Sequence, residues 1–189
     1  MDIIVSLFVD LADRELTCNC LDIITNLSKH IVLNEVVYGA ELVDSLFTLA
    51  QAVQVGSMPG MNAESMDLAI ECLRRLTLTG GNEVYLENLR DTDIELLVNL
   101  LVSPSLETRE SSLEILCTIS DKDTQNAALK LRIASQQRCI ERLIGLIAAG
   151  SCDSAIQGLI EEKVSKLAAL TLANLNMAPG NRALIAPYE

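Results

Sequence analysis

The sequence predicts an all-α protein built of repeated helices, and three observations support this class. Half of the 189 residues are hydrophobic, yet aromatic residues make up only 3% and tryptophan is absent. We therefore expect a core of leucine, isoleucine, valine and alanine, which pack helix against helix. The β-branched residues are scattered among leucines and alanines instead of alternating with polar residues, which argues against strands. The third observation is a helical pattern that recurs along the chain.

One class of helix recurs three times. Each copy begins with an acidic residue, carries apolar residues at helical spacing and has a leucine five positions after the acid. The copies occupy residues 41–46, 95–100 and 141–146, so their first residues are 54 and then 46 positions apart. These intervals indicate a repeated structural unit.

A second class of helix precedes these segments and ends at residues 26–28, 76–79, 118–120 and 174–176. A few residues later an asparagine opens the next helix, at Asn34, Asn82, Asn126 and Asn181. The side-chain oxygen of asparagine can accept from the free N–H groups of a first helical turn, so we expect these residues to cap helices. Their intervals of 48, 44 and 55 residues bracket the ~40–47 residues of armadillo and HEAT units. The predicted fold is an armadillo/HEAT-like right-handed superhelical solenoid, with about three full repeats and partial units at both ends.

We expect residues 1–189 to form a single repeat domain with a loop insertion near 54–62, followed by a helix that begins near Ala63. Further breaks between helices are predicted at 80–82, 103–105, 149–153 and 178–181. A natural solenoid normally closes with a polar-faced cap, and neither end of this sequence has that character. The chain is therefore expected to be a fragment of a longer protein.

The net charge of −12 is concentrated in the N-terminal half, where residues 1–100 hold 16 acidic and 5 basic residues. Such a surface repels phosphate backbones, so direct nucleic-acid binding is not expected. One interpretation is a solubilising surface, and the other is a docking surface for a basic segment of a partner.

Several classes of site have little support in the sequence. The six cysteines form no CxxC pair, and His30 is the only histidine, so we expect neither a metal site nor a cofactor. We expect no enzyme activity, because a nucleophile would have no base with an orienting partner. The start lacks a signal peptide and no run of ~20 apolar residues occurs, which predicts a soluble, intracellular protein without a membrane span.

The C-terminal stretch 167–175, followed by 179–182 and 187–189, resembles the end of the C-terminal armadillo-like region of the ARID-containing large subunit of SWI/SNF chromatin remodellers. Residues 68–77 and 82–86 are similar to upstream helices of that region, so the resemblance covers about residues 63–189. It implies a nuclear scaffold that binds neighbouring subunits, including helical segments of the remodelling ATPase, and that does not read DNA sequence. The DNA-binding ARID lies outside the region that this chain resembles.

An alternative function is an armadillo adaptor that binds short extended peptides and is unrelated to chromatin. Ladders of asparagine amides can hold a peptide main chain, and Asn26 and Asn174 occupy the required position. Thr77 and Thr118 replace asparagine in the two middle repeats, so this ladder would lack its central members. The two asparagines could equally hold loops together, and a partner helix in an apolar groove suits the chain better.

The basic residues supply the remaining candidate partner-binding positions. Arg138 and Arg142 are four residues apart and are expected to share one helix face. They could pair with nearby acids, or form a docking patch for an acidic segment or for nucleosomal DNA; the same alternatives apply to Arg74, Arg75, Lys130 and Arg132. Asn181 and Arg182, at the start of the last helix, complete the candidate set.

Overall fold

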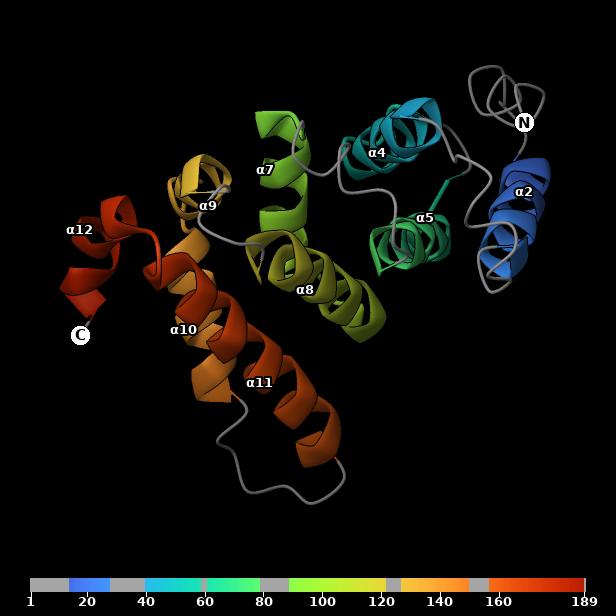
Figure 1. The fold of residues 1–189 in the computed structure, drawn as a ribbon. Coiled ribbons are helices and arrows are strands. Elements are labelled where there is room, and N and C mark those ends of the chain that lie inside the picture. The colour runs from blue at the N-terminus through green and yellow to red at the C-terminus, as the bar shows by residue number, and fades with distance from the viewer. Residues whose placement is uncertain are drawn as a thin grey trace. The chain divides into compact units, whose positions relative to one another are not determined.

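A computed structural model describes residues 14–27, 40–58, 61–78, 89–121, 127–149 and 157–188 of the chain. Within these ranges every regular element is a helix, which confirms the predicted all-α class (Figure 1). The α-helices are α2 (Arg14–Leu27), α4 (Ala40–Gln54), α5 (Ala63–Leu78), α7 (Asp91–Leu100), α8 (Leu106–Asp121), α9 (Ala127–Ala134), α10 (Cys139–Ala149), α11 (Gln157–Asn176) and α12 (Arg182–Ile185). Two short 3₁₀-helices, η2 (Pro179–Asn181) and η3 (Ala186–Tyr188), flank α12.

The chain divides into two compact units, Met1–Asn88 and Leu89–Glu189. The first contains α2, α4 and α5, and the second contains the remaining helices. Each unit has its own core and is described here by itself. The expectation of one continuous repeat domain stays a prediction.

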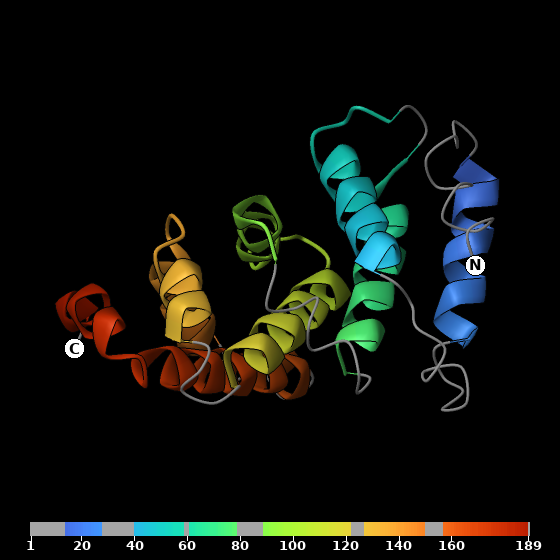
Figure 2. The same ribbon diagram turned by 45° about the horizontal axis from the view of Figure 1, so that its top comes forward.

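In the first unit, α5 packs against both α2 and α4, and Figure 2 shows α4 and α5 side by side. Two side-chain hydrogen bonds define how α2 and α5 run. Cys18 Sγ lies 3.7 Å from Ser65 Oγ, and Thr25 Oγ1 lies 2.7 Å from Cys72 Sγ. Both pairs are 47 residues apart, so the two helices are parallel and aligned with a constant offset.

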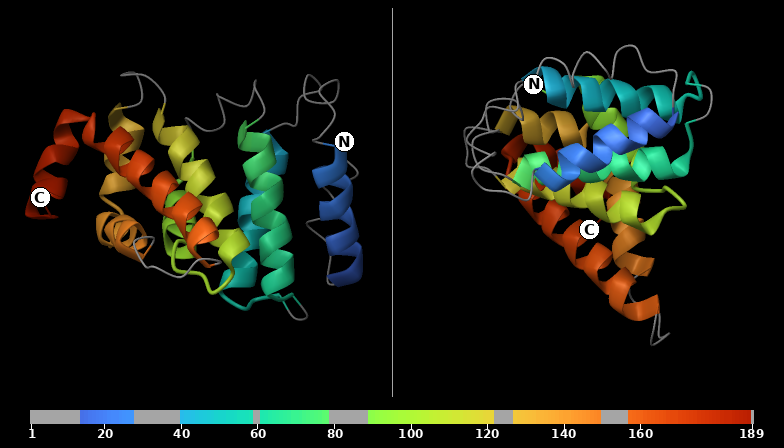
Figure 3. Two further views of the ribbon diagram at one scale, coloured as in Figure 1. Left: turned by 90° about the horizontal axis from the view of Figure 1, so that it is seen from below. Right: turned by 90° about the vertical axis from the view of Figure 1, so that its right-hand side faces the viewer.

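In the second unit, the long helices α8 and α11 lie alongside each other (Figure 3). Lys163 pairs with Glu110 near one end, 53 residues away, and Asn174 Nδ2 lies 3.5 Å from the carbonyl oxygen of Cys117 near the other end, 57 residues away. These helices are therefore also parallel. The shorter helix α7 packs on α8, and α10 packs on α11 as a helical hairpin.

The core is aliphatic, as predicted. The large side chains with almost no exposed surface include Phe47 and many leucines and isoleucines, among them Leu21, Ile24, Leu42, Leu46, Ile70, Leu73, Leu76, Ile94, Leu96 and Leu97. Burying each of them contributes about 1.5–3 kcal/mol relative to leaving it exposed. In α5 the buried positions cover a broad face of the helix, because α5 packs against two neighbouring helices, α2 and α4.

Both predicted classes of helix and several predicted breaks are confirmed. The acid-led segments 41–46, 95–100 and 141–146 lie in α4, α7 and α10, and the ends of the second class lie in α2, α5, α8 and α11, as far as the structure describes them. α4 ends at Gln54 and α5 begins at Ala63, as expected for the loop near 54–62. Residues 103–105 separate α7 from α8.

At the starts of α5 and α8, a nearby side chain accepts a hydrogen bond from a backbone N–H group of the first turn. Asn62 Oδ1 accepts a hydrogen bond from the backbone N–H of Ser65 at 3.2 Å, so this loop residue caps α5. Ser105 Oγ accepts from the N–H of Thr108 at 3.3 Å and caps α8 in the same way. Each bond satisfies one of the N–H groups that a first helical turn leaves without an intrahelical partner.

The predicted capping role of Asn181 is wrong. Its side chain makes no capping hydrogen bond to α12. Instead its amide nitrogen donates to the carbonyl oxygens of Lys130 at 3.1 Å and Leu175 at 2.9 Å. The reason is the 3₁₀ turn before α12, which holds Asn181 in a helical conformation (φ −84°, ψ −16°) instead of the extended one typical of a cap, and buries its side chain completely. The other three predicted capping asparagines lie outside the described residues.

Candidate functional site

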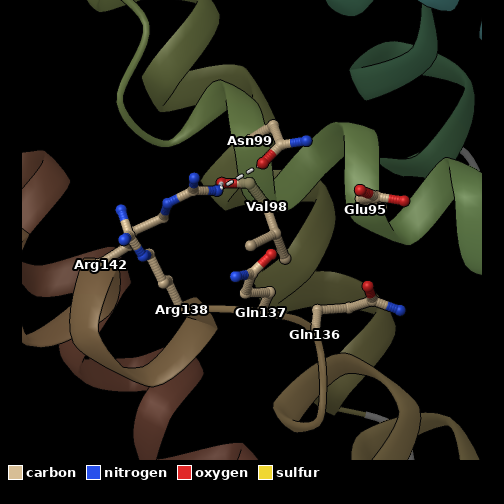
Figure 4. A pocket seen from close by; sticks show the side chains of 7 residues that line it. All are labelled: Glu95, Val98, Asn99, Gln136, Gln137, Arg138 and Arg142. Carbon is tan, nitrogen blue, oxygen red and sulfur yellow. Dashed lines mark hydrogen bonds between the residues drawn. The ribbon is translucent and has the colours of Figure 1, made fainter.

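A polar pocket of about 220 Å³ lies in the second unit, between the last turns of α7 and the turn that leads into α10 (Figure 4). Its lining is polar apart from one valine and consists of Glu95, Val98, Asn99, Gln136, Gln137, Arg138 and Arg142. The chain bends back at residues 135–138, and this bend brings the glutamines and Arg138 opposite α7.

Arg142 ties α10 to α7 at the floor of this pocket. Its Nη1 donates to the carbonyl oxygen of Val98 at 2.8 Å and to Asn99 Oδ1 at 2.7 Å. The last carbonyl groups of a helix have acceptor capacity to spare and form the negative end of its dipole, so a cation is favourable there. The other N–H groups of this guanidinium bond to none of the described residues.

Arg138 lies in the turn just before α10, and the prediction that it shares a helix face with Arg142 is wrong. α10 begins at Cys139, and Arg138 has a φ of 61°. This left-handed conformation costs an L-residue about 1–2 kcal/mol. The sharp turn nevertheless places its side chain beside that of Arg142 (Figure 4). Its guanidinium is exposed, and within the described part of the chain it has no ion pair or hydrogen bond.

The pocket has positively charged groups at one end and a negatively charged group at the other. The guanidinium groups of Arg138 and Arg142 lie at one end, and the carboxylate of Glu95 lies at the other, with Gln137 between them (Figure 4). The amides of the lining can both donate and accept hydrogen bonds. These are groups that bind and orient a polar ligand, and none of them is a nucleophile paired with a base.

The structure brings together only two of the six predicted partner-binding residues, Arg138 and Arg142. Asn26 is exposed near the end of α2, in the first unit, and Arg182 is exposed at the start of α12. Asn174 is only 5% exposed, and Asn181 is fully buried. The buried pair serves packing within the second unit in this conformation.

Four polar lining residues were not predicted from the sequence: Glu95, Asn99, Gln136 and Gln137. Glu95 and Asn99 stand four apart on α7, and Arg142 follows Asn99 by 43 residues, close to one repeat. That spacing is the only feature of the sequence that could have linked them.

Three of the other basic residues, Arg74, Arg75 and Arg132, pair with acids as the simpler interpretation expected. Arg74 and Arg75 each place Nε 2.6 Å from a carboxylate oxygen of Glu71. Burial alone would raise the pKa of Glu71, but the two guanidinium groups outweigh it and lower the pKa. Arg132 binds Asp91 at 2.8 Å, and Lys130 is almost fully buried.

The thiols of the described residues are not arranged for chemistry. Cys20, Cys72, Cys117 and Cys139 are buried. Burial raises the pKa of Cys72 to about 11 and that of Cys139 to about 12, so both are protonated near neutral pH. Within the described ranges no three His, Cys, Asp or Glu side chains gather in a way that could hold a metal ion.

A membrane span requires a long and strongly apolar helix, and the described helices do not meet this requirement.

The fold and the pocket define an all-helical protein, over the part that the structure describes, with a polar pocket between helices. No protein-family model matches the sequence, and no curated protein is significantly similar to it.

Proposed function

We propose that the chain is a non-catalytic protein–protein interaction scaffold with an armadillo/HEAT-like fold, a right-handed superhelical solenoid. The main support is the spacing of its side-chain contacts. Hydrogen bonds that join one predicted repeat to the next connect residues between 41 and 57 positions apart, within both units. These separations bracket the repeat intervals of 44 to 55 residues in the sequence, as expected if equivalent helices stack on one another.

The helix lengths support the same assignment. α9, α10 and α11 have 8, 11 and 20 residues and form a three-helix unit that ends in its longest helix. The long helices α8 and α11 pack in parallel, as do α2 and α5 in the first unit. Small-angle scattering of the intact chain tests the arrangement: a solenoid has an elongated distance distribution, whereas a compact bundle has a symmetric one.

The observation that carries the interaction function is the pocket lined by Arg138 and Arg142. It offers charged and amide groups, among them the exposed side chain of Arg138, that can bind another molecule, and its lining holds no catalytic pair. A protein partner fits this chemistry better than a nucleic acid, because the chain carries a net charge of −12.

The resemblance of residues 63–189 to the large subunit of SWI/SNF remodellers narrows the proposal. The chain would be nuclear and would organise subunits of such a complex, including helical segments of the ATPase. Basic segments of these partners would meet the acidic N-terminal half.

A pull-down with purified remodeller core subunits and ATPase tests this proposal. The immobilised chain is expected to retain at least one of them, while an unrelated helical protein of similar negative charge retains none. Binding to no subunit contradicts the remodeller function. A gel-shift assay at low salt, where electrostatic binding is strongest, is expected to give no shift of DNA.

The alternative peptide adaptor gains no specific support. The hydroxyl groups of Thr77 and Thr118 bond to carbonyl groups of their own helices, Leu73 and Glu114, and Asn174 is buried. These contacts do not provide a ladder of free amides.

A further inference from the structure

We infer that the pocket between α7 and α10 recognises a carboxylate, the side chain of an aspartate or glutamate on a segment of a protein partner. This inference rests on the proposed interaction function and adds the chemistry of the ligand. It assigns Arg138 and Arg142 as the groups that bind the carboxylate, and Asn99, Gln137 and Glu95 as groups that orient the segment around it.

The donors of the pocket suit a carboxylate. Arg142 is held in place by Val98 and Asn99, so part of its guanidinium is fixed before any ligand arrives. Arg138 lies beside it, and its guanidinium makes no ion pair with any described residue. A guanidinium can bind a carboxylate through two parallel N–H···O bonds, and such charge-assisted bonds are among the strong ones.

The opposite end of the pocket disfavours a ligand that carries more negative charge than a carboxylate. The carboxylate of Glu95 repels a phosphate group, which carries more negative charge than a carboxylate. The same carboxylate accepts hydrogen bonds, so it favours an N–H donor a short distance from the bound acid. A peptide segment that presents an acidic side chain next to a basic or amide group meets both requirements.

Arg138 also offers an unusual test, because its φ of 61° suits glycine better than arginine. Replacing it by glycine removes the guanidinium and relieves the backbone at the same time. A loss of binding in Arg138→Gly therefore has no origin in a damaged fold, and a thermal melt of the variant checks this directly.

The binding experiment uses NMR on the ¹⁵N-labelled chain and two blocked peptides, acetyl-Ala-Glu-Lys-Ala-amide and acetyl-Ala-Gln-Lys-Ala-amide. The glutamate peptide is expected to shift the Nε–H signal of Arg138 and the side-chain amide signals of Asn99 and Gln137 until they saturate. The affinity of the glutamine peptide should be lower by a factor of about ten or more, because this peptide cannot form the charge-assisted bond.

Variants complete the test. Arg138→Gly should weaken the glutamate peptide about tenfold without lowering the melting temperature, and Arg138→Lys should recover part of the affinity. Lys166→Ala removes an exposed positive charge elsewhere in the same unit and should leave binding unchanged. Equal affinity for the two peptides, or unchanged binding to Arg138→Gly, overturns the inference. Inorganic phosphate binding as tightly as the glutamate peptide also overturns it, since the pocket would then be a general anion site.

The pull-down separates this inference from the proposed function. If remodeller subunits bind Arg138→Gly and the original chain with equal affinity, the scaffold function is supported. The same result contradicts the inference that these subunits dock at the carboxylate site. If the glutamate peptide binds at the pocket while no subunit is retained, the site stands and the remodeller function fails.

Discussion

The buried thiols of Cys72 and Cys139 have raised pKa values in the folded state. Desolvation is the largest cause of the raised pKa of both thiols. For Cys72, the hydrogen bond with Thr25 opposes the shift but does not cancel it. In the unfolded chain these thiols lose that environment and ionise near their ordinary pKa of 9.0.

The free energy of unfolding should therefore fall at alkaline pH. Each thiol stabilises the folded state fully below about pH 9, and this contribution is lost as the pH rises toward about 11 for Cys72 and about 12 for Cys139. The slope is at most about 1.4 kcal/mol per pH unit for each group. Urea unfolding between pH 8 and about 10.5 measures it.

The alanine variants Cys72→Ala and Cys139→Ala serve as controls, because each removes one titrating group. Each should have a shallower alkaline slope than the original chain, whatever its stability at pH 8. Identical slopes would contradict the assignment of the effect to these thiols.

Asn181 is the second residue whose role depends on burial. Its amide nitrogen satisfies two carbonyl groups, and a carboxylate of the same shape cannot donate to either. Asn181→Asp should therefore cost more than Asn181→Ala, which we expect to lower the free energy of unfolding by about 1–3 kcal/mol. Denaturant titration of both variants measures the order, and a smaller loss for aspartate than for alanine would refute this role.

At the scale of the element, the start of α5 is set by a residue next to it in the sequence, Asn62. Asn62 accepts from the first turn of the helix, and the helix that follows has the apolar spacing of an amphipathic segment. Asn62→Ala should cost about 1 kcal/mol, measured by thermal or urea unfolding. Asn19→Ala replaces an exposed asparagine within α2 and should not destabilise, since alanine has the higher helix propensity. Equal losses for the two variants would rule out the cap.

The boundaries of elements were predicted well where the cause lies within a few residues. Gly56, with a φ of 68°, follows the end of α4 at Gln54, and Ser105 caps the start of α8. The prediction failed at Asn181 and Arg138. There the conformation depends on a neighbouring 3₁₀ turn or on a bend between helices, neither of which helical periodicity reveals.

At the scale of the whole molecule, the two units have separate cores. Leu73 is 1% exposed in the first and Leu143 is fully buried in the second. Replacing either leucine by alanine should cost about 2–5 kcal/mol, because the cavity left behind adds to the lost burial. Because the two leucines belong to different units, the double variant should lose the sum of the two values within about 0.5 kcal/mol. Urea unfolding of the three variants tests this, and a coupling above about 1 kcal/mol would show that the cores are not independent.

The sequence by itself determined the helical class, the two recurring kinds of helix and the loops at 54–62 and 103–105, because periodicity and turn chemistry act over a few residues. It also placed Arg138 and Arg142 among the candidate binding residues. Only the tertiary structure decided which of the six candidates lie together and what surrounds them. Arg142 meets Val98 and Asn99 across more than 40 residues of chain, and Asn174 is turned into the core. Such contacts depend on the offset between packed helices, which no local pattern encodes.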